Sequence, residues 1–174
     1  MAIKKILTEP NKLLRQISEP VQRVGDNERK IMDDMLETMY SSNGIGLAAI
    51  QIGIAKRIIV LDISKEPEMK SPMYFVNPVI TNKNNEKTTY SEGCLSVPNQ
   101  FAEIERPSKC QIDYLDYNGE KKKLQAEGLL ATCIQHEMDH LEGILFIDYL
   151  SKLKRTMIIK KLSKQKVKSD RIVF

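Results

Sequence analysis

The sequence predicts an α+β fold in which mainly antiparallel β-sheets pack around one central helix, with an N-terminal helix and a C-terminal helix besides. Two observations carry this prediction. Apolar residues recur at helical spacing in three separate segments, whereas the short runs between them are rich in strand-forming residues. The turns that join these runs are too short for parallel crossovers, so neighbouring strands are expected to be antiparallel.

The first predicted helix begins near Asp26 or Asn27, either of which can cap it. Its apolar face consists of residues at helical spacing, and Asn43 with Gly44 provides the stop. The face is formed by Ile31, Met35, Leu36 and Met39.

Predicted strands follow, and Asn118 with Gly119 is expected to form a hairpin turn of type I′ between the last two. The segments 64–72 and 82–86 are polar and are expected to be solvated. The predicted strands span residues 57–63, 73–76, 87–90, 102–105, 110–117 and 121–127.

The central helix is predicted to hold both histidines of the chain, His136 and His140, with Glu137 directly after the first. Positions four apart lie on one face of a helix, so both imidazoles can reach one metal ion while Glu137 approaches it from the side. This HExxH pattern is typical of metallohydrolases, and the alternative is a pair of surface histidines on a charged helix. Gly143 provides the stop. The apolar positions are Leu129, Leu130, Cys133, Ile134, Met138 and Leu141.

A catalytic metal site of this kind needs a third protein ligand and keeps a position for water. Cys133 is on the same helix, but about 7.5 Å along the axis from the middle of the histidine pair. Cys110 stands in an alternating strand pattern, where a small buried side chain is expected. Cys94 is favoured, because Gly93 relieves the backbone before it and Pro98 closes the segment.

Residues 44–51 read GIGLAAIQ, a run of small residues that lets another backbone approach closely. Its one polar side chain, Gln51, can donate a hydrogen bond. The run lacks the third glycine and the preceding strand of a dinucleotide-binding loop. A packed turn with an incidental glutamine remains the alternative.

Three segments, GIGLAAIQ at 44–51, EGCLS at 92–96 and QHEMDH at 135–140, resemble the signature motifs of the peptide deformylases in order and separation. The likeness extends to residues 10–18, to RPSKCQIDYLDYNGE and to HLEGILFIDYL, and so covers most of the chain up to Leu150. It implies a catalytic domain over residues 1–150, with residues 151–174 as a basic C-terminal helix of the same domain. The implied activity of this bacterial type is removal of the formyl group from the N-terminal formyl-methionine of new polypeptides, with release of formate.

The resemblance also implies the roles of the site residues. Cys94, His136 and His140 hold one divalent metal ion, with Fe²⁺ as the physiological ion and Zn²⁺, Ni²⁺ or Co²⁺ also accepted by such ligands. Metal-bound hydroxide attacks the formyl carbonyl, and Glu137 serves as general acid and base. The Gln51 side chain and the Leu95 backbone N–H donate hydrogen bonds to the oxyanion.

For the substrate, the resemblance implies a methionine pocket formed by Ile45, Leu129, Cys133 and the ring of His136. Gly46 and the strand near Glu92 would offer backbone groups to the peptide as an added strand.

Two positions depart from the commonest pattern of the family. Phe101 stands where an arginine is frequent, and Thr132 where an aliphatic residue is frequent. Two other functions are considered: an HExxH zinc endopeptidase, and a non-enzymatic metal-binding protein.

The length of 174 residues and a hydrophobic content of 41% fit one domain with a core. No run is long and apolar enough for a membrane span or a signal peptide, and three cysteines with one assigned to metal favour a reducing cytoplasm. Neither a membrane nor a DNA partner is expected.

Positive charge is concentrated at the C-terminal end. Residues 152–174 contain nine Lys and Arg and one Asp, a net charge of +8. Met157, Ile158 and Leu162 are expected to pack on the domain, leaving the cations exposed. With the resemblance, this predicts a tail that docks on the ribosome, and a solvated helix end is the alternative.

Overall fold

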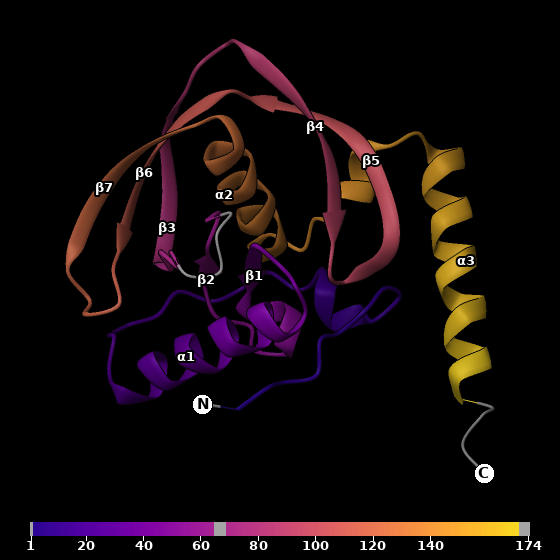
Figure 1. Ribbon diagram of the computed structural model, residues 1–174, viewed down its shortest axis with the longest axis horizontal. Helices are drawn as coiled ribbons and strands as arrows, with labels where there is room; N and C mark the ends of the chain where they lie inside the picture. The colour runs from indigo at the N-terminus through magenta and orange to yellow at the C-terminus, as the bar shows by residue number, and fades with distance from the viewer. Residues whose placement is uncertain (1, 65–68, 171–174) are drawn as a thin grey trace.

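The computed structural model describes residues 2–64 and 69–170, with only the backbone described for residues 165–170. The α+β class with mainly antiparallel sheets is confirmed (Figure 1). One sheet has the strand order β1-β2-β3-β6-β7, and β4 pairs with β5 in a separate hairpin. Its strands are β1 Gly46–Ala48, β2 Ile58–Leu61, β3 Met73–Lys83, β6 Lys109–Leu115 and β7 Lys121–Glu127, and the hairpin strands are β4 Lys87–Cys94 and β5 Val97–Pro107.

Helix α2, Gly128–Leu141, lies between the five-stranded sheet and the β4–β5 hairpin. Helix α1, Asp26–Ser41, packs against β1 and β2, and α3, Lys152–Asp170, stands beside β5 (Figure 1). Short 3₁₀ turns connect these elements: η1 Lys12–Arg15, η2 Ala49–Ile52 and η3 Phe146–Tyr149.

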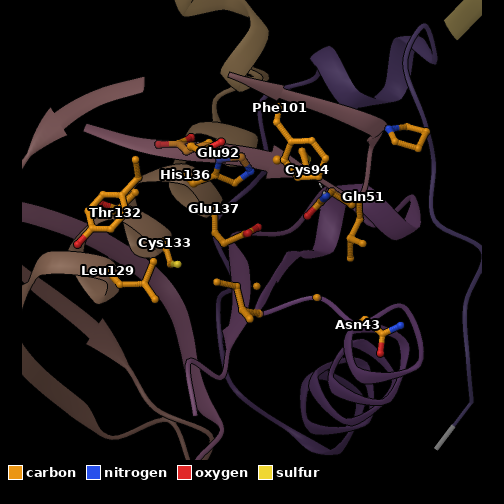
Figure 2. A pocket seen from close by; sticks show the side chains of 18 of the residues that line it. Asn43, Gln51, Glu92, Cys94, Phe101, Leu129, Thr132, Cys133, His136 and Glu137 are labelled. Atoms are coloured by element: carbon orange, nitrogen blue, oxygen red, sulfur yellow. Dashed lines mark hydrogen bonds and ion pairs between the residues drawn. The ribbon is translucent and has the colours of Figure 1, made fainter. Parts of the chain in front are cut away.

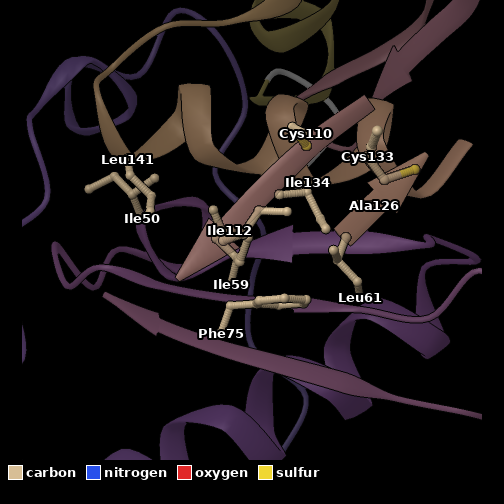
Figure 3. Close-up of a cluster of buried hydrophobic side chains, with 12 residues drawn as sticks. Ile50, Ile59, Leu61, Phe75, Cys110, Ile112, Ala126, Cys133, Ile134 and Leu141 are labelled. Carbon is tan, nitrogen blue, oxygen red and sulfur yellow. The ribbon is translucent and has the colours of Figure 1, made fainter. Parts of the chain in front are cut away.

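Strand β2 contributes side chains to two separate hydrophobic clusters. All four of its side chains are buried, and alternate residues of a strand point to opposite faces. Ile59 and Leu61 therefore join the cluster beneath α2 (Figure 3), whereas Ile58 and Val60 join the cluster beneath α1. In this way β2 fixes the position of both helices relative to one sheet.

A third cluster attaches the C-terminal helix. Leu162 of α3 is buried together with Phe146 of η3 and Val97 of β5. The prediction for this helix was partly wrong, because Met157 is mostly exposed and Ile159 packs with Ile158 and Leu162 instead. Helix α3 is thus held against β5 and η3 by its buried apolar side chains.

The predicted cap of α1 was wrong. The helix is preceded by Gly25 in an extended conformation, and the Glu28 carboxylate accepts a hydrogen bond from the Gly25 N–H at 3.0 Å. Glu28 reaches back from the third helical position, so neither Asp26 nor Asn27 is needed as a cap. The predicted stop is confirmed, since Asn43 has a φ of 54° and the Gly44 N–H donates to the Met39 carbonyl.

The predicted strand at 73–76 was too short. Strand β3 continues to Lys83 through Asn77 and Pro78, where its register with β6 shifts between Val76 and Val79. Asn77 has a φ of 51°, and proline lacks the N–H for a ladder bond. The chain therefore passes these two residues as an irregularity within one strand.

The hairpin strands were also longer than predicted. Strand β4 runs on to Cys94, and β5 begins at Val97, so Pro98 lies within a strand and does not close the segment. Residues 65–68 of the predicted loop at 64–72 lie outside the described residues.

The predicted turn type before β7 was wrong. The Gly119 N–H donates to the Asp116 carbonyl, and only Gly119 of the predicted pair has a positive φ, at 82°. The Asp116 carboxylate accepts from the N–H groups of Asn118 and Glu120 at 2.9 Å each. These bonds favour a type I turn followed by a left-handed glycine, which is another common hairpin connection.

Candidate metal site and active site

Helix α2 supplies three of the candidate side chains. His136, Glu137 and His140 are all buried, which is unusual for polar side chains and costs free energy wherever a polar atom lacks a partner. The helix begins at Gly128, whose φ is 58°, and ends before Gly143, whose φ is 71°. Apolar packing of Ala131 and Ile134 on the sheet orients the helix so that His136 and Glu137 face the pocket.

The third predicted ligand, Cys94, is the last residue of β4. The β4–β5 ladder shifts register between Gly93 and Cys94, at the end of the hairpin. Cys94 Sγ lies 3.2 Å from His140 Nε2, and the possible ligand atoms of Cys94, His136 and His140 all lie within 4.8 Å of one another. Cys110 and Cys133 belong to the apolar cluster beneath α2. The structure therefore brings together the three residues that the sequence singled out.

These donors fit a divalent metal ion. Ligand atoms around a tetrahedral ion, at about 2.1 to 2.3 Å from it, lie about 3.5 Å from one another, comparable with the separations in this cluster. Burial holds the pKa of His140 well below its ordinary value, and this favours the neutral ring that a metal ligand needs. A thiolate with two imidazoles is a donor set that divalent transition metals accept.

The orientation of the His136 ring is fixed by a contact of its Nδ1 with Glu92. Glu92 Oε2 contacts His136 Nδ1 at 2.8 Å, and Arg106 binds both oxygens of Glu92 at 2.6 and 3.0 Å. Burial alone would raise the pKa of Glu92, but the contacts with His136 and Arg106 outweigh burial and lower it. For His136, burial would lower the pKa, whereas hydrogen bonds with Cys94 and Glu92 raise it.

This network continues to the protein surface. Arg106 also donates to Asp139 Oδ2 at 2.8 Å, and the Tyr149 hydroxyl donates to the same oxygen at 2.8 Å. Sequence reasoning missed Arg106, Asp139 and Tyr149. All three lie in segments of the family likeness: Arg106 begins RPSKCQIDYLDYNGE, Asp139 lies in QHEMDH, and Tyr149 lies in HLEGILFIDYL. That likeness was the available signal.

Gln51 is held in place by three contacts. Its Oε1 accepts from the Ala48 N–H at 2.7 Å, and its Nε2 donates to Ser96 Oγ at 3.1 Å and to Cys94 Sγ at 3.5 Å. The amide donor therefore points at the candidate metal ligand. Leu95, the other predicted oxyanion donor, directly follows Cys94 in the turn between β4 and β5.

Glu137 occupies the space over a glycine. A Cβ at Gly46 would lie only 2.9 Å from Glu137 Cδ and 2.8 Å from a methyl group of Leu61. Among the described residues, Glu137 Oε2 has no hydrogen-bond partner although it is buried. Burial raises the pKa of Glu137 to about 7, against the lowering effect of the His136 charge. The unpartnered carboxyl group is thus placed to take part in proton transfer.

The candidate site opens into a cavity of about 460 Å³ (Figure 2). In the view of Figure 2, Leu129, Thr132 and Cys133 lie on one side of Glu137, and Phe101 with Cys94 lies on the other. Thr132 is buried, and its hydroxyl has no partner among the described residues. The predicted substrate-binding residues Ile45, Gly46, Glu92, Leu129 and Cys133 all line this cavity.

Such a cavity, with a Cys-His-His cluster and a buried carboxylate on its wall, is of the metallohydrolase class. The family model for polypeptide deformylase matches residues 3–156. The peptide deformylase of Pelagibacter ubique (strain HTCC1062) is 72% identical over 173 residues, which cover 99% of each chain. That of Phenylobacterium zucineum (strain HLK1) is 57% identical over 164 residues, covering 94% of this chain and 97% of the relative.

Solved structures agree. A crystal structure of peptide deformylase from Ehrlichia chaffeensis in complex with actinonin has a TM-score of 0.91 at 45% identity, covering 95% of this chain and 98% of that chain. A peptide deformylase from Legionella pneumophila has a TM-score of 0.90 at 41% identity, covering 98% and 99%. The chain belongs to the polypeptide deformylase family.

Proposed function

We propose that this chain hydrolyses the formyl amide at the N-terminus of formyl-methionyl nascent polypeptides, giving formate and a free methionine amine. The observation that carries the proposal is the Cys94, His136 and His140 cluster beside the unpartnered carboxylate of Glu137. Family membership supports the same activity.

The metal ion, when bound, supplies Lewis acidity and lowers the pKa of water at the site. Glu137 takes a proton from the attacking water and delivers it to the amine nitrogen as the C–N bond breaks. The Gln51 amide and the Leu95 N–H donate hydrogen bonds to the oxygen of the tetrahedral species. Glu92 and Arg106 hold the His136 ring in orientation throughout.

The methionine side chain enters the apolar part of the cavity. Leu129 and Cys133 line it together with His136. Ile45 also lines the cavity and is exposed, which places it at the rim. Gly46 and the strand near Glu92 offer backbone groups to the peptide, because β1 begins and β4 ends at this cavity. The Glu92 carboxylate itself is engaged by Arg106 and His136, so its contribution to substrate binding is through the backbone.

The test is formate release by protein purified without oxygen, together with analysis of its metal content. We expect Fe²⁺ as the physiological ion, with Zn²⁺, Ni²⁺ or Co²⁺ as ions the same ligands hold. The protein should release formate from formyl-methionyl peptides and leave unformylated peptides intact. Cleavage of unformylated peptides would instead support the HExxH endopeptidase, and metal binding without either reaction would support a non-enzymatic role.

The cellular setting is also proposed. The helices of the described residues include none that is both long and apolar enough to cross a membrane. We infer a cytoplasmic protein whose α3 helix docks on the ribosome near the emerging chain. In support, Lys160, Lys161 and Lys164 are exposed on α3, whereas Leu162 holds the helix on the domain.

A further inference from the structure

Three large apolar side chains are exposed at the mouth of the active-site cavity, together with the uncharged polar side chains of Asn43, Ser91 and Asn99. Ile45, Leu129 and Phe101 line it with exposed fractions of 44%, 37% and 72%. Apart from cysteine and tyrosine, the cavity is lined by three ionisable residues. These are Glu92, His136 and Glu137, and all three are buried at the metal end. A chain leaving the site through this mouth therefore meets exposed hydrophobic surface without a fixed charge.

Phe101 is the most exposed of these side chains, and its position is set by a glycine. It stands directly opposite Gly93 in the β4–β5 ladder. A Cβ at Gly93 would lie 2.5 and 2.8 Å from two carbons of the Phe101 ring, so the ring fills the space that a side chain at position 93 would need. One face of the ring covers Gly93, next to the candidate ligand Cys94.

The distance from the Cys94, His136 and His140 cluster to the Phe101 ring corresponds to the length of a few peptide residues. Directly opposed residues in an antiparallel pair lie about 5 Å apart, and an extended chain advances about 3.3 Å per residue. With the formyl group near Cys94 and the methionine side chain beside Leu129 and Cys133, the ring is within reach of the next two residues.

We propose that Phe101 is a specificity-determining residue that favours apolar side chains at the two positions after the formyl-methionine. The proposal rests on the proposed deformylase function. Contact with such a side chain removes apolar surface on both partners from water, whereas an acidic or basic side chain at this place loses hydration without gaining a partner.

Phe101 also has a structural role that does not depend on substrate, because an aromatic ring across from a glycine stabilises a strand pair. That role alone would make a substitution affect every substrate equally. A specificity role changes the ratio between substrates, so the ratio is the informative measurement.

The experiment compares kcat/KM for formate release from formyl-Met-Ala-Ala with that from peptides carrying leucine or glutamate at the second or third position. The metal-loaded wild type is compared with Phe101→Ala and Phe101→Arg. Val79→Ala is the matched control, because Val79 is an exposed apolar strand residue outside the cavity.

We expect the wild type to prefer leucine over glutamate about tenfold or more at one of the two positions, in the range that apolar contacts discriminate. Phe101→Ala should remove most of that preference, Phe101→Arg should reverse it toward glutamate, and Val79→Ala should keep it. An unchanged ratio, or an equal loss for all peptides, would overturn the role of Phe101. No formate from any peptide with the wild type would overturn the proposed function itself.

Discussion

Glu92 Oε2 lies 2.8 Å from His136 Nδ1, and the same carboxylate is bound through both oxygens by Arg106. One ring nitrogen of this histidine is therefore taken by a carboxylate, which leaves Nε2 directed to the metal position. Outer contacts of this kind fix ring orientation and raise the affinity of metal sites.

Arg106→Lys tests this relationship. Lysine cannot reproduce the paired contact with Glu92, so we expect metal affinity to fall about 10- to 100-fold, with activity recovered in excess metal. Metal titration by calorimetry measures the affinity. Tyr149→Phe removes only the outer bond to Asp139 and should change affinity little. Equal metal affinity of wild type and Arg106→Lys would contradict the positioning role.

Glu137→Ala tests the proton transfer. Glu137 does not belong to the Cys-His-His cluster, so the variant should keep its metal yet lose at least roughly a hundredfold in turnover. His136→Ala should lose both metal and activity. Metal content and formate release are measured on the same samples. Loss of metal from the Glu137 variant would show that this side chain is a ligand.

Gln51→Leu tests the oxyanion contact. We expect kcat to fall by about 10² to 10³ with KM nearly unchanged. Because the buried Ala48 N–H loses its acceptor, the free energy of unfolding should also fall, by about 1–3 kcal/mol. Ser96→Ala removes only one contact of the amide and should leave most of kcat. A Gln51 variant weakened mainly in KM would indicate ground-state binding.

Glu28 should make folding stability depend on pH in the acid range. Its contact with Lys56 at 2.8 Å lowers the pKa of Glu28 to about 2, below the ordinary 4.5. The stabilisation is therefore complete above the ordinary pKa and is lost as pH falls toward 2. Glu28→Gln should be about 1 kcal/mol less stable than wild type near neutrality and equal to it near pH 2.

Urea unfolding of the metal-free proteins at several pH values measures this difference. The matched control is Asp26→Asn, because Asp26 is fully exposed in its pair with Arg29 and should contribute little at any pH. A constant gap between Glu28→Gln and wild type from neutrality to about pH 2 would exclude the ionic contribution.

The charge of α3 is tested by substitution, since deleting residues 160–174 would also remove buried Leu162. Replacing Lys160, Lys161 and Lys164 with glutamine should lower the affinity for the ribosome and make that affinity less dependent on salt concentration. The hydrolysis of short peptides should stay unchanged. The control places three glutamines at exposed lysines of the sheets, Lys87, Lys109 and Lys123. Equal ribosome affinity of the two variants would remove the special role of α3.

The local patterns in the sequence were sufficient for the class of fold and for the grouping of Cys94 with the two histidines. Helical spacing fixes His136 and His140 on one face, and this depends on nothing outside the helix. Arg106 could not be predicted in the same way, because it follows the predicted strand at 102–105 and its partners are distant in the sequence. Arg106 is buried because β5 packs against both β4, which carries Glu92, and α2, which carries Asp139.

Other errors have the same origin. The extension of β3 through Pro78 depends on pairing with β6, and the choice between Met157 and Ile159 on α3 depends on where β5 and η3 lie. The turn at Gly119 was set by hydrogen bonds of the Asp116 side chain. Each outcome was decided by a contact between segments, or by side-chain competition for backbone groups.

Cys94 and His140 are 46 residues apart in the chain, on β4 and α2, yet their donor atoms lie side by side. An ion bound to both acts as a reversible cross-link that the unfolded chain cannot form without closing a long loop. Binding of the ion and folding of the chain are then linked equilibria. The concentration of free ion therefore sets the fraction of unfolded chains, which are the ones open to proteolysis. We therefore expect the lifetime of the folded chain to increase with the supply of an ion that this cluster binds.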